Sequence, residues 1–274
     1  MLYNLREVHR PRDLDEAIQL LQRADVRTVP LAGGTALVGQ RAGEVEAVVD
    51  LSDLGLDSIE FENGLLRLGA TATLQSIVEE LDDTYGGLLA GAAHRMAGWN
   101  LRNAATVGGT LAAGLIHSPL SVALAALGAE VAVTGQDERI PWPAELDLSG
   151  RLITAVTVPV YKTDVGTAYE QVGRTPADLP IVSAAGVARE VEEGMISARV
   201  VVGGLLAGAL KVLDVGLERS EPDISAVEAI ADGLDDAALE SSYLGTPAYR
   251  RAVAPVLARR ALTAALAAIG YEFE

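Results

Sequence analysis

The pattern of apolar and polar positions in the first 160 residues predicts a mixture of helices and strands. Apolar residues recur at the spacing of one helix face over Leu14–Leu21, and Asp13 and Glu16 have the spacing of a capping box. The same periodicity predicts helices over residues 73–81, 88–96 and 119–127, the last with Ser118 as its N-cap and Pro119 at its first position. Asn63-Gly64 predicts a hairpin-type turn before the strand at residues 65–68. Short apolar runs bounded by turn residues predict buried strands over residues 26–32, 48–51, 65–68, 130–134 and 153–158.

The pattern changes near residues 159–166, and the rest of the chain groups strands before helices. Strands are predicted over residues 169–172, 182–189 and 196–202, the last two joined as an antiparallel hairpin through residues 190–194, and helices over residues 224–233 and 248–269. This order is typical of an α+β fold. We therefore expect a first domain over residues 1–160, with lobes of about 1–55 and 56–160, and a second over residues 165–274.

Composition narrows the classes of function. The 274 residues carry a formal charge of −17, and lysine occurs only at Lys162 and Lys211, which argues against nucleic acid as a partner. Cysteine is absent, so this chain alone can hold neither a disulfide nor an iron–sulfur cluster. The uncharged stretch 103–129 is broken by glycines and a Ser-Pro pair, which favours a buried turn and a core helix over a transmembrane segment. Residues 1–6 show no signal-peptide pattern, so we expect a cytoplasmic protein.

Two Gly-Gly pairs, Gly33-Gly34 and Gly108-Gly109, are the most informative local features. Glycine allows a positive φ and a close approach of the backbone to a ligand. Successive free N–H groups in such a turn form a concave anion site, which suits an acidic protein with few lysines. The nearby hydroxyls of Thr35, Thr106 and Thr110 could add donors. A plain tight turn is the alternative for each pair, and the hypothesis of a shared site requires the two turns to meet in space.

The two turns and the segments after them resemble those of the FAD-binding subunits of molybdenum hydroxylases, the xanthine dehydrogenase and carbon monoxide dehydrogenase medium-subunit group. Residues 32–35 (AGGT) resemble the A-G-G-[TH] stretch of that group, and residues 102–112 (RNAATVGGTLA) are similar to its R-N-x-x-T-[IV]-G-G-[NS]-[LI]-A signature. Residues 124–131, 169–178 and 249–262 then resemble later segments of the same family in the same order. The resemblance covers nearly the whole chain.

The resemblance implies FAD between two parts of the protein, with its pyrophosphate on the two glycine turns. The residues that it points to are Leu31, Ala32, Gly33, Gly34, Thr35, Ala36, Leu37, Ala105, Thr106, Gly108, Gly109 and Thr110, with Ile153 packing on the flavin. No metal-binding residue and no catalytic residue is implied. Electrons would come from an iron–sulfur small subunit, after a molybdenum-cofactor large subunit has oxidised the substrate, and would pass to NAD, oxygen or a quinone.

Several positions depart from the family pattern. Thr110 stands where Asn or Ser is usual, Pro119 where an acidic residue is frequent, and Gln171 where a basic residue is frequent. Thr175 and Ala36 also differ, and the stretch from residue 38 to residue 46 is short. These changes favour a second hypothesis, in which the chain is a flavin-free structural or assembly subunit of the same fold. A third, a self-sufficient FAD oxidase or dehydrogenase, would need its own substrate base.

Four further side chains have two interpretations each. His117 follows the second turn and could face the flavin or simply occupy a helix entry. Tyr161 and Tyr169 could stack on a flavin ring or pack in the core. Arg102 could neutralise the pyrophosphate or bond local carbonyl groups.

Overall fold

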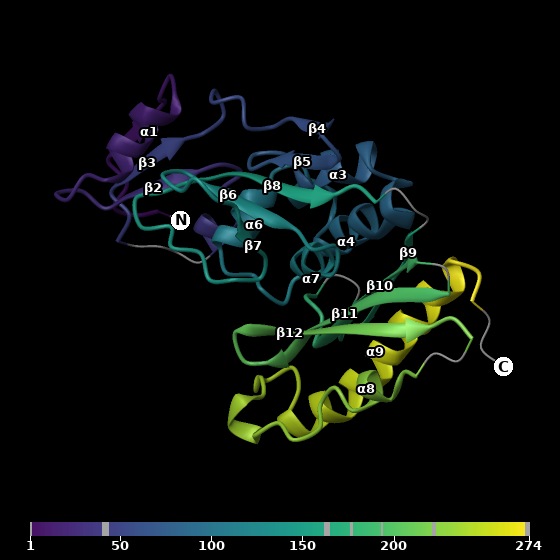
Figure 1. The fold of residues 1–274 in the computed structure, drawn as a ribbon. Helices are drawn as coiled ribbons and strands as arrows, with labels where there is room; N and C mark the ends of the chain where they lie inside the picture. Colours follow the sequence, from purple (N-terminus) through teal and green to yellow (C-terminus); the bar gives the residue numbers. More distant parts are fainter. Residues whose placement is uncertain are drawn as a thin grey trace. The chain divides into compact units, whose positions relative to one another are not determined.

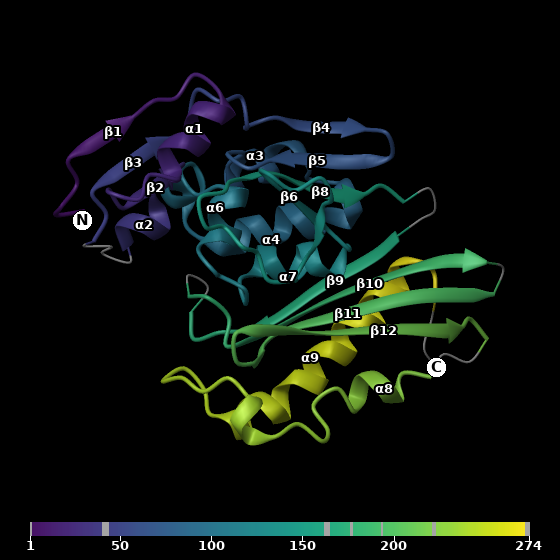
Figure 2. The ribbon, with the colours of Figure 1, turned by 60° about the vertical axis from the view of Figure 1, so that its left-hand side comes forward.

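The structure, a computed structural model, describes residues 2–39, 44–161, 165–175, 178–192, 194–220 and 223–271, and the chain forms two compact units (Figures 1 and 2). Unit 1 comprises Met1–Glu80, Gly98–Leu115 and Ala129–Pro159, and unit 2 comprises Leu81–Ala97, Ile116–Gly128 and Val160–Glu274. The expected domains 1–160 and 165–274 stay a prediction, because compact units report packing and not independent folding. The expected boundary falls partly on residues 162–164, outside the described residues.

The first lobe of unit 1 is a parallel sheet in the order β1-β3-β2 (Glu7–His9, Ala47–Asp50, Thr28–Leu31) with helices α1 (Leu14–Leu21) and α2 (Thr35–Gly39). The predicted cap of α1 is confirmed, since Asp13 Oδ1 accepts from the Glu16 N–H at 2.8 Å. Glu16 accepts from the Arg12 N–H instead of completing the box. Ala17 and Leu21 bury their side chains with residues 49, 51 and 152.

The second lobe of unit 1 is an antiparallel sheet in the order β4-β5-β8-β6-β7. Its strands are Ile59–Glu62, Leu65–Gly69, Ile153–Pro159, Glu130–Val133 and Ile140–Pro141 in that order. Asn63 and Gly64 both have positive φ, 52° and 76°, as the predicted hairpin turn between β4 and β5 requires. The unit also contains the helices α3 (Leu74–Glu80), α5 (Trp99–Arg102) and α6 (Val107–Ala112).

Unit 2 is built on an antiparallel sheet in the order β12-β11-β10-β9. The strands are Ala209–Glu218, Met195–Leu206, Val182–Glu192 and Val165–Val172. Its helices are η1 (Thr84–Gly87), α4 (Leu88–Met96), α7 (Pro119–Ala126), α8 (Ser225–Glu228), η2 (Asp236–Ala238) and α9 (Pro247–Ala268). The hairpin of β10 and β11 confirms the prediction, although its residue 193 lies outside the described residues.

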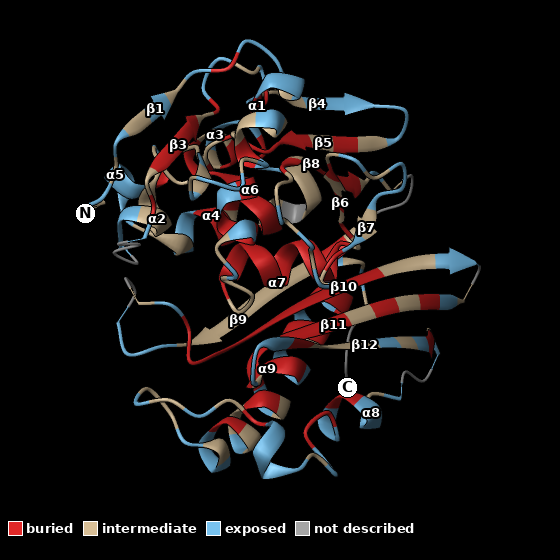
Figure 3. Cartoon of the chain, turned by 90° about the vertical axis from the view of Figure 1, so that its left-hand side faces the viewer, coloured by how far each residue is buried: buried red, intermediate tan, exposed pale blue. Residues whose placement is uncertain are grey.

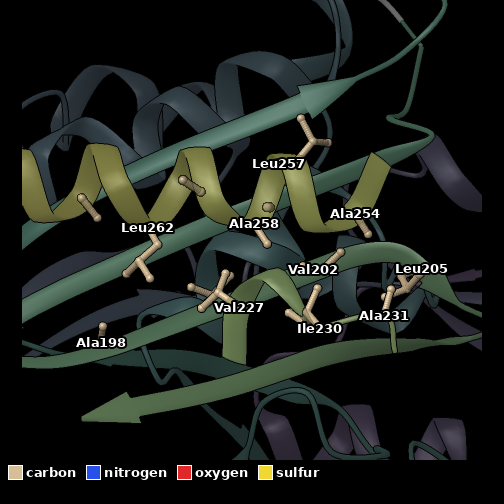
Figure 4. Close-up of a cluster of buried hydrophobic side chains, with 14 of the residues drawn as sticks. Ala198, Val202, Leu205, Val227, Ile230, Ala231, Ala254, Leu257, Ala258 and Leu262 are labelled. Atoms are coloured by element: carbon tan, nitrogen blue, oxygen red, sulfur yellow. The ribbon is translucent and has the colours of Figure 1, made fainter. Parts of the chain in front are cut away.

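The sheet of unit 2 is covered on both faces, which explains why β10 and β11 are so strongly buried (Figure 3). Gly186 lies against α9 at Ala261, whereas Gly203 lies against α7 at Val122. Figure 4 shows the α9 side of this core, where Ala258 and Leu262 meet side chains of β11 and α8. The predicted α+β class is confirmed.

Some elements were not predicted. Strands β1, β4, β7 and β12 are short or lie at sheet edges, where polar side chains obscure the alternation. The predicted helix 224–233 is wrong in length, because α8 ends at Glu228 and turns follow it. None of the helices in the described part of the chain has the length and apolar character that a membrane crossing requires.

Candidate functional site

A pocket of about 280 Å³ opens in unit 1, and its wall contains both glycine turns. Ten of the thirteen residues expected at a cofactor site line this pocket: Ala32, Gly33, Gly34, Thr35, Ala36, Leu37, Thr106, Gly108, Gly109 and Ile153. Leu31, Ala105 and Thr110 flank it without lining it. The turns, which are more than 70 residues apart in the sequence, therefore meet in space, as the hypothesis of a shared site requires.

The first turn connects β2 to α2 and offers unbonded backbone donors. Gly34 has a φ of 67°, which explains the glycine at this position. The first intrahelical bond runs from the Val38 N–H to the Gly34 carbonyl at 2.9 Å. Within the described residues, the N–H groups of Thr35, Ala36 and Leu37 have no protein acceptor. This turn can therefore donate several hydrogen bonds to an anion in the pocket.

Gly33 is required for a different reason, which is the contact between the two turns. A Cβ placed on Gly33 would overlap the carbonyl oxygen of Ala104, which lies in the second turn at residues 103–110. The Ala104 and Ala105 N–H groups both bond to the Leu101 carbonyl, so this backbone is fixed by the end of α5. Glycine at position 33 therefore lets the first turn pack directly on the backbone of the second.

The second glycine pair is not a positive-φ turn, so that expectation was wrong. Gly108 and Gly109 lie inside helix α6, whose N-cap is Thr106. The Gly108 N–H donates to the Ala70 carbonyl at 2.8 Å, and the Gly109 N–H donates to Thr106 Oγ1 at 3.1 Å. A Cβ on Gly108 would lie 2.8 Å from the Cβ of Ala70, so glycine allows α6 to pack on the end of β5.

Because the backbone amides of its glycine pair are bonded within the protein, the second turn contributes a part of the pocket wall and one hydroxyl group. Thr106 Oγ1 accepts from Gly109, and its own proton remains available to a ligand. The hydroxyl of Thr110 instead donates to the Thr106 carbonyl at 2.9 Å, and Thr110 is 4% exposed. Of the three hydroxyl groups predicted as donors, those of Thr35 and Thr106 belong to residues that line the pocket, whereas the hydroxyl of Thr110 is bonded inside α6.

The pocket wall also contains residues that sequence reasoning missed. Leu148, Arg151 and Leu152 line it just before Ile153, which begins β8. Arg151 is the charged member of the wall within the described residues. Its position two residues before Ile153 was an available signal, because an anion site in an acidic chain favours a nearby cation.

Arg102 and His117 have partners that account for their positions. Arg102 is 8% exposed and donates from Nε to Gln75 Oε1 at 3.0 Å, which links α5 to α3. In unit 2, His117 Nδ1 accepts from the Gly204 N–H at 3.1 Å, and burial lowers the pKa of its imidazole. Neither residue lines the pocket of unit 1.

The two tyrosines weighed as stacking groups also lie in unit 2, among protein partners. Tyr161 donates its hydroxyl to the Leu127 carbonyl at 3.0 Å, and the guanidinium of Arg189 lies 4.9 Å from its ring centre. Tyr169 has the guanidinium of Arg95 at 5.5 Å, and burial raises the pKa of its hydroxyl. These contacts agree with the packing interpretation of both rings.

Comparison with known families identifies the cofactor of the chain. Residues 3–161 match the family model described as the FAD binding domain in molybdopterin dehydrogenase. The chain belongs to this family. FAD is therefore its cofactor, and the chain is a subunit of an oxidoreductase of the molybdenum hydroxylase type, as the sequence resemblance implied.

Similar proteins extend the likeness to nearly the whole chain. The carbon monoxide dehydrogenase medium chain of Afipia carboxidovorans is 27% identical over 95% of this chain and 96% of that protein. The uncharacterized protein YgfM of Escherichia coli is 29% identical over 92% and 93%. A chain of carbon monoxide dehydrogenase from Hydrogenophaga pseudoflava has a similar structure, with a TM-score of 0.81, 25% identity and coverage of 98% and 99%.

Proposed function

We propose that this chain is the electron-relay subunit of a molybdenum hydroxylase complex. It would receive electrons from iron–sulfur clusters of a small subunit, after a molybdenum-cofactor large subunit has oxidised the substrate. It would deliver them to NAD, a quinone or oxygen. The similarity to a carbon monoxide dehydrogenase medium chain along 95% of the chain supports a medium-subunit role. The absence of cysteine requires that any iron–sulfur cluster be held by another chain.

The observation that carries this proposal is the pocket shared by the two turns. The free N–H groups of Thr35, Ala36 and Leu37 and the hydroxyl of Thr106 would hold the pyrophosphate of FAD. The pocket volume of about 280 Å³ lies at the low end of small-molecule sites, so it fits part of a dinucleotide. The residues present therefore fit the phosphate-bearing part of FAD.

The remaining wall would orient the cofactor and exclude water. Leu37, Leu152 and Ile153 add apolar side chains to the wall of the pocket. Within the described residues, the wall contains no carboxylate and no imidazole that could serve as a substrate base. FAD, when bound, supplies the redox chemistry, and the chain supplies position and electrostatics.

The first experiment is purification of the tagged chain from its native source with its partners. Flavin would be measured by absorption, and molybdenum and iron by elemental analysis. The proposal expects all three to co-purify, whereas the chain expressed alone should contain flavin without iron. A complex that contains flavin and lacks molybdenum and iron would contradict the relay role.

A second experiment addresses the electron acceptor. The flavin of the purified complex would be reduced anaerobically by light, and NAD⁺, a soluble quinone or oxygen would be added separately. The proposal expects at least one of the three to restore the flavin absorption band rapidly. If none of them restores the band, the proposed acceptors are wrong.

The flavin-free alternative is tested by the same preparations. One of the departures that prompted it has a structural explanation, because Pro119 is the first residue of α7 after its N-cap Ser118. Gln171 Oε1 is buried, and within the described residues it has no hydrogen-bond partner. A folded chain that retains no flavin, alone or in its complex, would favour this alternative.

A further inference from the structure

We propose that Arg151 binds the pyrophosphate of FAD and sets much of the affinity of the pocket for this cofactor. Arg151 lines the same pocket as Gly34 and Thr35, and within the described residues it is the charged side chain of that wall. The inference rests on the proposed placement of the pyrophosphate at the first turn. It adds a side-chain cation to a site otherwise formed by backbone and hydroxyl donors.

The electrostatic need for such a group follows from the charge of the chain. A formal charge of −17 opposes the approach of any anion, and screening leaves this repulsion effective within about 10 Å at 0.1 M salt. Backbone donors direct hydrogen bonds but carry no net charge. One guanidinium on the pocket wall would offset the repulsion locally, and its planar fork matches phosphate oxygens.

The backbone at Arg151 is fixed by a tight turn. Gly150 has a φ of 62°, and its carbonyl accepts from Gln22 Nε2 at 3.4 Å. The Arg151 N–H bonds to the Leu148 carbonyl at 3.2 Å. This turn joins directly to β8, so the Cα of Arg151 is held at the pocket while its side chain can move.

Within the part of the chain that the structure describes, one exposed ion pair holds the Arg151 side chain. Arg151 Nη1 lies 3.4 Å from Asp147 Oδ2, and the two side chains are 34% and 61% exposed. The Ser149 N–H bonds to Asp147, which lowers the pKa of that carboxyl group and keeps it ionised. Exposed pairs of this kind contribute about 0–1 kcal/mol, so a doubly charged pyrophosphate can displace Asp147 as the partner of Arg151. Asp147 would therefore compete with FAD for the guanidinium.

A matched pair elsewhere in unit 1 provides the control. Arg139 Nη1 lies 3.8 Å from Glu130 Oε2, with side chains 45% and 44% exposed. Neither residue lines the pocket. Arg139→Gln and Glu130→Gln thus remove the same charges as Arg151→Gln and Asp147→Asn without touching the proposed contact.

The test titrates FAD into the flavin-depleted full-length chain and follows flavin fluorescence. Arg151→Gln should raise the Kd about 10-fold, as expected for loss of one charge-assisted hydrogen bond. Asp147→Asn should lower the Kd by about threefold, because it frees the guanidinium. The Kd ratio of Arg151→Gln to wild type should shrink between about 50 mM and about 500 mM NaCl. The Arg139 and Glu130 controls should each stay within about twofold of wild type.

Competition identifies the part of FAD that is bound. ADP, which carries a pyrophosphate, should compete less well in Arg151→Gln than in wild type, whereas competition by adenosine should not change. Equal losses for ADP and adenosine would place Arg151 on the adenosine moiety and overturn the assignment.

Two further results separate this inference from the function on which it rests. If wild type binds FAD and Arg151→Gln binds it equally well, or Asp147→Asn behaves like Glu130→Gln, the role of Arg151 is wrong and the proposed function stands. If folded wild type binds no FAD, the proposed function fails together with this inference. Asp147→Asn keeps the test decisive even if Arg151→Gln does not fold.

Discussion

Gly33 and Ala104 pack so closely that a single added carbon on Gly33 would overlap the Ala104 carbonyl oxygen. This contact joins the backbone of the first glycine turn to that of the second, although about 70 residues separate them in the sequence. The pocket therefore depends on packing between two backbone segments as well as on the donors within each.

Substitution of Gly33 by alanine should separate the two turns. Overpacking of this kind costs about 1–3 kcal/mol of unfolding free energy, and we expect a lower Tm together with a clear loss of FAD affinity. Gly39→Ala is the control, because Gly39 lies at the end of the adjoining helix α2 and a Cβ there meets nothing within 4 Å. An unchanged FAD Kd in Gly33→Ala would contradict this account of the contact.

Thr106 should contribute to both stability and binding through one oxygen atom. Thr106→Ala removes the N-cap of α6 and should lower the unfolding free energy by about 1 kcal/mol, and it should also weaken FAD binding. Thr106→Ser retains the hydroxyl and should restore most of both properties. Thermal unfolding and FAD titration of the two variants test this, and equal behaviour of the variants would show that the hydroxyl is unimportant.

Substitution of Arg250 should be among the changes in unit 2 that lower the unfolding free energy most. It is 2% exposed and donates to the carbonyls of Ile181, Gly204 and Gly245, so it ties strand β11 and the segments before β10 and α9 to the start of α9. Arg250→Ala leaves these acceptors unsatisfied and should cost about 3 kcal/mol or more in denaturant unfolding. Arg259→Ala, which removes an exposed ion pair between α9 and Glu228 of α8, should cost less than about 1 kcal/mol. Similar losses for both variants would contradict the assigned role.

His117 should make the chain less stable in mild acid. Burial holds the pKa of His117 below its ordinary value of 6.5, despite the carboxylate of Glu240 at 3.9 Å; Arg250 lowers this pKa further. The unfolded chain therefore binds a proton more readily than the folded one, so stability falls as the pH drops through 6.5. Unfolding free energies measured between about pH 7.5 and about pH 5.5 should fall more for wild type than for His117→Asn. Parallel curves for the two proteins would show that His117 does not cause the effect.

The sequence predicted the caps and turns whose conformation depends on neighbouring residues. The cap at Asp13, the Asn63-Gly64 turn and the Ser118-Pro119 helix start all arise from neighbouring residues, and each is confirmed. The helical state of Gly108 could not be predicted in this way, since glycine disfavours helices and its contact with Ala70 is long-range.

The candidate site was predicted in part for the same reason. The turn around Gly34 is visible in the sequence, because it combines glycine, a hydroxyl residue and a preceding strand. Arg151 was missed although it lies two residues before Ile153, because its place on the pocket wall follows from the way the loop before β8 folds over the first lobe. The grouping of segments 81–97 and 116–128 with unit 2 is likewise a result of tertiary packing, without a marker in the sequence.

The central claim is that this chain holds FAD in the pocket between its two glycine turns. The most direct test is the visible absorption spectrum of the purified chain after incubation with excess FAD and removal of unbound cofactor, for wild type and Gly33→Ala in parallel. The account predicts flavin bands near one equivalent in wild type and a marked loss in the variant. A folded wild-type chain without flavin, or equal flavin retention in both proteins, would contradict it.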